Sequence, residues 1–226
     1  MRHWIILAAL YGFVLWCGCG PISLRVPNVA PQQVGLVSQN ASDWYLFYGS
    51  AAGSPLITDG PQGTLTPIAG AIGYVDIPNE PGHVNYIQTP YFAPTQLPSE
   101  IDSTIQIEAE DATYWQADPN DTDPATFHIF FEVQNDNLQS PNGRFWYSYK
   151  PELPTNGVQT FVIKAPFDPA QWGNVDGSAF TAAEFQVSLQ SIGWVGLTFG
   201  GQDFDGHGVG MAAGKARVTV VDFQVR

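Results

Sequence analysis

The sequence predicts an all-β fold, a two-sheet antiparallel β-sandwich with one short helix. Aromatic residues make up 13% of the chain, and charged residues only 13%. The 23 glycines and 18 prolines divide it into short segments. Several of these segments alternate apolar and polar residues, which is the period of a strand with one face in a core. Short alternating segments separated by turn residues are typical of a β-sandwich.

The predicted strands follow one another along the chain, with glycine, proline, asparagine or aspartate between them. In one of them Ile105 and Ile107 face one way, and Gln106 and Glu108 the other. In another, four apolar residues (Phe127, Ile129, Phe131 and Val133) lie opposite His128, Phe130 and Glu132. The expected strands span residues 44–48, 71–77, 83–89, 103–111, 126–134, 144–150, 159–165, 193–200 and 216–226.

One segment departs from the strand period and predicts a short helix within residues 178–191. Ser178 or Thr181 can cap its first turn. Its apolar residues recur at helical spacing, so we expect it to pack across an end of the sandwich through Ala182, Phe185 and Leu189.

The first residues have the layout of a secretory signal peptide, assigned to residues 1–19. Basic Arg2 and His3 precede an apolar run that is too short for a transmembrane helix. The run ends in Cys17-Gly18-Cys19, which resembles a bacterial lipoprotein signal with Cys19 as the acylated residue. That signal usually has leucine three residues before the cysteine, where this chain has Trp16. A lipid anchor and simple secretion therefore both remain open.

Residues 20–42 are rich in proline, glutamine and serine, and we expect them to be a linker. Residues 43–226 then form the β-sandwich domain. Both cysteines of the chain lie in the leader, so the domain is expected to hold together by its core, without disulfides.

The charge balance excludes two classes of partner. The chain has 8 Lys+Arg against 21 Asp+Glu, a net charge of -13. Phosphate backbones would be repelled, which argues against nucleic-acid binding. Adhesion to anionic membranes is equally disfavoured, so any membrane contact would pass through the lipid anchor.

The stretch GGQDFDGHGVG, residues 200–210, places Asp203, Asp205 and His207 at alternate positions. Metal binding or catalysis by His207 is conceivable there. However, five glycines in eleven residues favour a mobile loop in which ligands would be poorly preorganised. We therefore interpret the stretch as the connection to the last strand.

Two carboxylates two residues apart, Glu108 and Glu110, share one face of a predicted strand. Their spacing, about 6.5–7 Å along the backbone, is near that of a glycosidase acid/base pair. The simpler interpretation is the solvated face of an edge strand. A carbohydrate-active enzyme that uses this pair is the alternative.

Aromatic and hydrogen-bonding residues occur side by side within residues 135–150. Sugar rings stack on indole and phenol rings, while amide, carboxylate and guanidinium groups bind the hydroxyls. This pattern predicts a glycan site formed by Asn135, Asp136, Asn142, Arg144 and Trp146.

The order of elements resembles the galactose-binding-like jelly rolls, in particular the laminin-B-type domain and related carbohydrate-binding modules. The residues that carry the resemblance are a YxxxP-like stretch from Tyr86 to Pro90, Trp172 before the helix of residues 178–191, the strand 193–200 and Asp222-Phe223. The resemblance covers roughly residues 43–226 and is one of pattern. It implies a jelly-roll sandwich, often with a structural calcium and often with a sugar ligand.

Asp222 is the candidate calcium ligand that the resemblance implies, together with Asp43 and Asp59. It stands in an apolar final strand, where a buried carboxylate would need a partner. In the alternative interpretation Asp222 faces solvent, on the same side as Val218, Val220 and Gln224.

These observations together predict an exported domain, either lipid-anchored in a bacterial cell envelope or free in the extracellular space. A glycan or polysaccharide is the expected ligand, bound without catalysis. The alternatives are the enzyme described above and a purely structural surface protein. Structural calcium is the only cofactor expected.

Overall fold

The computed structural model describes residues 37–49, 61–91, 97–116, 123–134, 136, 143–175, 177–201 and 206–226. They belong to one compact unit, Gln33–Arg226. Among them no helix is both long and apolar enough to cross a membrane.

The described residues are mostly antiparallel strands, which confirms the all-β class. One α-helix, α1 (Ala182–Leu189), and two 3₁₀ turns at Ala41–Asp43 and Pro169–Gln171 accompany them. The strands are β1 (Tyr45–Gly49), β2 (Gly63–Thr64), β3 (Gly73–Asp76), β4 (His83–Pro90), β5 (Glu100–Gln116), β6 (Thr126–Val133), β7 (Arg144–Tyr147), β8 (Gly157–Pro166), β9 (Trp172–Asn174), β10 (Ile192–Gly200) and β11 (Val209–Val225).

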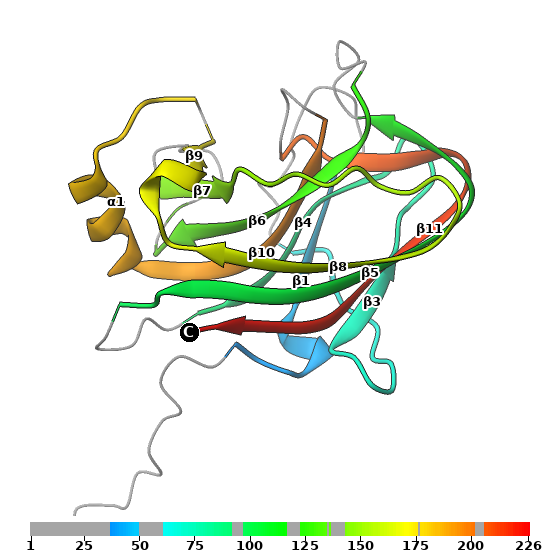
Figure 1. The fold of residues 1–226 in the computed structure, drawn as a ribbon. Coiled ribbons are helices and arrows are strands. Elements are labelled where there is room, and N and C mark those ends of the chain that lie inside the picture. The colour runs from blue at the N-terminus through cyan, green and yellow to red at the C-terminus, as the bar shows by residue number, and fades with distance from the viewer. Residues whose placement is uncertain are drawn as a thin grey trace, which may run out of the picture. The chain divides into compact units, whose positions relative to one another are not determined.

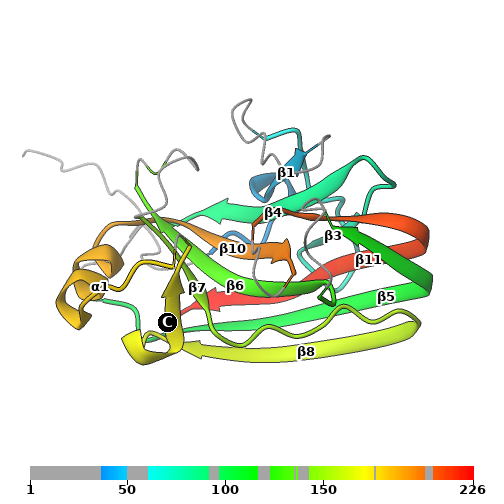
Figure 2. The same ribbon diagram turned by 90° about the horizontal axis from the view of Figure 1, so that it is seen from above.

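The strands form two layers that face each other across the core, as the predicted sandwich requires (Figures 1 and 2). The first layer is β8-β5-β11-β3, and the second is β2-β1-β4-β10-β6-β7-β9. The two layers are one continuous sheet, because the start of β11 pairs with β4 at Val209 and Val84. Rings from both layers meet inside: Phe127 of β6 and Phe161 of β8 have centroids 5.3 Å apart.

Strand β6 shows why the second layer forms. Phe127, Ile129 and Phe131 alternate into the core and are fully buried, as their period of two predicts. The residues between them are buried as well, on the opposite face of the layer. Strand β6 is therefore buried on both faces, where the alternation predicted one.

The helix α1 begins at the predicted cap, and two of the three residues expected to pack are buried, whereas Ala182 is exposed. Thr181 caps it through a capping box with Glu184. Phe185 and Leu189 are buried, and the Phe185 ring lies 5.7 Å from that of Phe131. Figure 1 shows α1 at one end of the sandwich.

The glycine-rich stretch differs from the predicted mobile loop. Its end already belongs to β11, which starts at Val209. Gly206 and Gly208 adopt positive φ angles, and both donate their N–H groups to the Phe199 carbonyl at 3.0 Å. The Asn85 amide donates to the carbonyls of Gly206 and His207, at 3.0 and 2.8 Å. This end is thus a turn fixed by a buried amide, while Asp203 and Asp205 lie outside the described residues.

The final strand changes face at a β-bulge between Val220 and Asp222. Beyond it Phe223 and Val225 are buried on the core side, in addition to Val218 and Val220. The expectation that Asp222 shares a face with Val218 and Val220 is therefore wrong, because one extra residue reverses the alternation.

Candidate functional site

The outer face of the second layer, which points away from the core, carries an unusual set of side chains. The strand register places them in adjoining rows across β1, β4, β10, β6 and β7. We call this set the aromatic–polar face; it consists of Tyr45, Phe47, Tyr86, Gln88, Trp194, Thr198, His128, Phe130, Glu132, Arg144 and Trp146.

Aromatic rings form a second apolar cluster on this face. Phe47, Tyr86 and Phe130 are buried, and Tyr45 and Trp146 pack against them half-buried. The Trp146 indole leans over Gly173 of β9, where a Cβ atom would lie 2.7 Å from its Nε1.

A further half-buried indole completes the border of the face. Trp194 contacts the Tyr45 ring at 5.7 Å between centroids. Half-buried rings are held by their neighbours yet keep part of their surface available to a ligand.

Charged groups occupy the row beside these rings. Glu132 and Arg144 are opposite each other in the register of β6 and β7, and Arg144 Nε lies 3.6 Å from Glu132 Oε2. Arg144 Nη2 lies 3.4 Å from Asp136 Oδ1, and Nη1 donates to the Tyr86 hydroxyl at 3.0 Å. Gln88 donates from Nε2 to Glu132 Oε1 at 3.3 Å. All five side chains are buried almost completely.

Burial decides the charge state of this network. Desolvation raises the pKa of Glu132 to about 8, although the nearby Arg144 guanidinium acts in the opposite direction. Asp136 adds a second negative charge that raises the pKa further. One guanidinium thus lies beside two carboxyl groups, and Glu132 retains its proton near neutral pH.

The hydrogen bonding of Gln88 agrees with a protonated Glu132. In the described structure Gln88 Oε1 is buried and accepts no hydrogen bond. Amide oxygen and nitrogen are assigned by their surroundings and can be exchanged. Turning the amide of Gln88 by half a rotation lets a neutral Glu132 donate to this oxygen.

Of the five predicted glycan ligands, Arg144 and Trp146 lie on this face, and Asp136 pairs with Arg144. Asn135 and Asn142 lie outside the described residues. The prediction overlooked Glu132, Gln88 and Tyr86. The signal for Glu132 was present, because it is an acidic residue in the apolar run TFHIFFEV.

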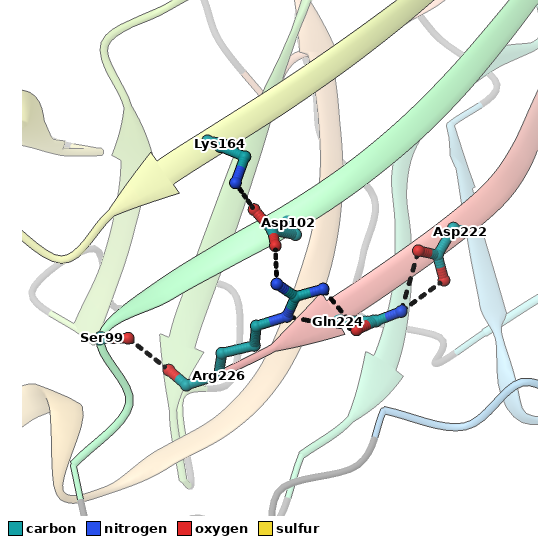
Figure 3. Close-up of polar contacts among 6 residues, drawn as sticks. All are labelled: Ser99, Asp102, Lys164, Asp222, Gln224 and Arg226. Carbon is teal, nitrogen blue, oxygen red and sulfur yellow. Dashed lines mark hydrogen bonds and ion pairs between the residues drawn. The ribbon is translucent and has the colours of Figure 1, made fainter.

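Asp222 belongs to a row of polar side chains on the outer face of the first layer (Figure 3). Both of its oxygens accept from the Gln224 amide, at 3.2 and 3.0 Å. Gln224 in turn accepts from Arg226. Arg226 reaches Asp102 at 2.8 Å, and Lys164 approaches the same carboxylate at 3.8 Å. Protein cations thus compensate the charge of Asp102, while Asp222 accepts from a neutral amide.

Of the other predicted calcium ligands, Asp43 has hydrogen-bond partners of its own. The Asp43 carboxylate accepts from the Ser38 hydroxyl at 2.6 Å and from the Asn40 amide at 3.4 Å, beside the first 3₁₀ turn. Asp59 lies outside the described residues. No group of three or more acidic, histidine or cysteine side chains suited to a metal occurs in the part of the chain that the structure describes. The described candidates Asp43 and Asp222 alone supply fewer than the six to eight oxygen ligands that calcium takes.

Glu108 and Glu110 line a surface groove of about 640 Å³, which lies over the paired strands β5 and β11 and is also lined by residues of β3 and β8. Both are exposed, and Glu110 lies 3.7 Å from the equally exposed Lys215. At the same groove Arg217 makes a bidentate ion pair with Asp76, at 2.7 and 3.1 Å. An exposed, paired carboxylate is a poor general acid, because that role needs a pKa raised by burial.

No family model and no curated protein matches the chain. Among solved structures, a chain described as "xylan-binding module CBM15" is similar over 83% of this chain and 95% of its own length. The two share 12% sequence identity, and the TM-score is 0.39. At this level the similarity supports neither a common topology nor a common ligand.

Proposed function

We propose that this chain is a non-catalytic polysaccharide-binding domain, and that the sugar lies against the aromatic–polar face. The observation that carries the proposal is the placement of Tyr45, Trp146 and Trp194, half-buried rings on the same face as a buried Glu132–Arg144–Asp136 network.

The rings match the apolar surfaces of a pyranose. Aromatic side chains bind the C–H faces of sugars while polar groups beside them orient the hydroxyls. Tyr45 and Trp194 form one edge-to-face pair, and Trp146 stands on the far side of Phe130. Separate rings on one face suit a chain of several sugar units better than a single ring.

The buried network serves this surface as a support. Arg144 precedes Trp146 by two residues on β7, and its guanidinium is held by Tyr86 and Asp136. A fixed β7 backbone holds the Trp146 indole over Gly173, so binding would not require the ring to be ordered first.

An overall charge of -13 also bears on the ligand. Strongly anionic polysaccharides would be repelled at long range, so neutral polysaccharides are the better candidates. The same proposal places the domain outside the cytoplasm, tethered through Cys19 where that residue is lipidated. Mass spectrometry of the mature N-terminus tests this part.

Affinity electrophoresis in gels that contain neutral or anionic polysaccharides tests the binding proposal. We expect retardation in at least one neutral polysaccharide, and Trp146→Ala or Trp194→Ala should weaken binding by about tenfold or more, which is about 1.4 kcal/mol.

Tyr149→Ala is the matched control, because this ring is 50% exposed and lies away from the aromatic–polar face. Binding to none of the polysaccharides, or equal losses in all three variants, would refute the proposal. Release of reducing sugar that disappears in Glu110→Gln would instead support the enzyme.

A further inference from the structure

Strand β8 forms a free border of the first layer. It pairs with β5 from Gly157 to Pro166 without a register shift. The described residues include no strand on its other side, and Figure 2 shows β8 along one border of the sheet. Such a border presents a row of unpaired N–H and C=O groups to any strand that approaches.

The features that usually protect an edge strand are weak here. The only proline of β8 is its last residue, and the pairing with β5 shows no bulge. Val158 and Val162 are 62% and 73% exposed. The single charge, Lys164, is directed toward Asp102 of β5 at 3.8 Å.

Space beside the strand is open as well. A groove of about 500 Å³ runs along the border, between residues 149–155 and the β8 residues Gln159 and Phe161. Within β8 the residues from Gly157 to Thr160 are exposed on both faces.

The low charge along this border allows a second copy of the chain to approach it. A second copy of a chain with net charge -13 is repelled by most of the surface. Residues 157–166 include no aspartate or glutamate and one lysine. The border of β8 is therefore a surface where two copies can meet with little repulsion.

We propose that two copies of this chain associate through β8, whose free borders pair antiparallel about a two-fold axis. An axis at Thr160 sets Val158 opposite Val162 of the partner subunit, and the symmetry repeats this contact. Pairs of β-branched residues opposite each other stabilise antiparallel strands. A closed two-fold pair uses the same surface on both subunits and leaves no further β8 border exposed.

Sedimentation equilibrium of the full chain, over a wide range of concentration, tests the proposal. We expect a monomer–dimer equilibrium in the wild type, and its loss in Val162→Lys and in Val158→Lys. Val187→Lys is the matched control, because Val187 is 63% exposed on α1 and should leave the dimer intact.

The substituted side chains are exposed, so the variants should keep the wild-type circular dichroism spectrum and melting temperature. Hydrogen exchange gives a second readout: dilution of the wild type should accelerate exchange in β8, and the two β8 variants should exchange rapidly at every concentration. A wild type that is monomeric throughout, or a dimer that survives Val162→Lys, would overturn the proposal.

Discussion

Replacing Glu132 by glutamine should make the protein more stable at alkaline pH and leave its stability nearly unchanged below pH 4.5. The pKa of Glu132 is about 8 in the folded protein, against 4.5 for the free side chain. The folded state therefore holds this proton more tightly than the unfolded state. Stability from this group is complete below pH 4.5 and is lost as the pH rises to about 8.

The size of the effect follows from the shift. Each pKa unit corresponds to about 1.4 kcal/mol, so the rise from 4.5 to about 8 sets a ceiling of about 5 kcal/mol. Glutamine has the same shape and does not titrate, and it can still bond to Gln88. The difference in unfolding free energy between Glu132→Gln and the wild type should grow by a few kcal/mol between these two pH values.

Urea unfolding followed by tryptophan fluorescence at a series of pH values measures this difference. Glu108→Gln is the control, since Glu108 is exposed. The unfolding free energy of this variant should run parallel to that of the wild type over the pH series. Parallel curves for Glu132→Gln would refute the reasoning. So would a loss of stability confined to alkaline pH, because it would mean that an ionised Glu132 is needed by Arg144.

Three further predictions test other parts of the structure. Thr181→Ala removes the capping box of α1 and should lower the unfolding free energy by about 1 kcal/mol, measured by urea titration. Gly196→Ala should lower it by about 2 kcal/mol or more, because the added Cβ would lie 2.0 Å from the Ile87 carbonyl oxygen on β4. Gly63→Ala is its control, with the nearest atom 3.8 Å away, and equal effects at both positions would contradict the packing argument. Addition of EDTA should leave the melting temperature unchanged, because Gln224 already occupies both oxygens of Asp222; a clear decrease would restore the calcium hypothesis.

Local pattern was enough to predict most of the strands and the helix, but not the short strands β2 and β9. The alternation around Phe127 and Phe131 identifies the core face of β6, and the Thr181 cap identifies the start of α1. These features depend on residues close in sequence. The start of β11 within a glycine-rich stretch was not predictable in this way, because it depends on Asn85, more than a hundred positions away.

In the candidate site too, features set by residues close in sequence were predicted, and features set by distant residues were not. The prediction brought Asp136, Arg144 and Trp146 together because they are near in sequence. It missed Gln88 and Glu132, which meet from strands separated by β10. The alternation of apolar and polar residues in β6 also does not reveal that the face with the polar residues is buried. The burial of this face depends on which strands become neighbours of β6.

The last strand of the chain lies in the interior of the sheet. β11 pairs with β5, β3 and β4, and the register joins Val225 to Ile101. Contacts between residues so far apart in sequence form late and slowly during folding. During synthesis β4 and β5 are therefore made before β11, the strand that comes to lie between them in the sheet. A chain that ends before β11 would lack the strand that connects its two layers, and its first layer would lose the strand between β5 and β3.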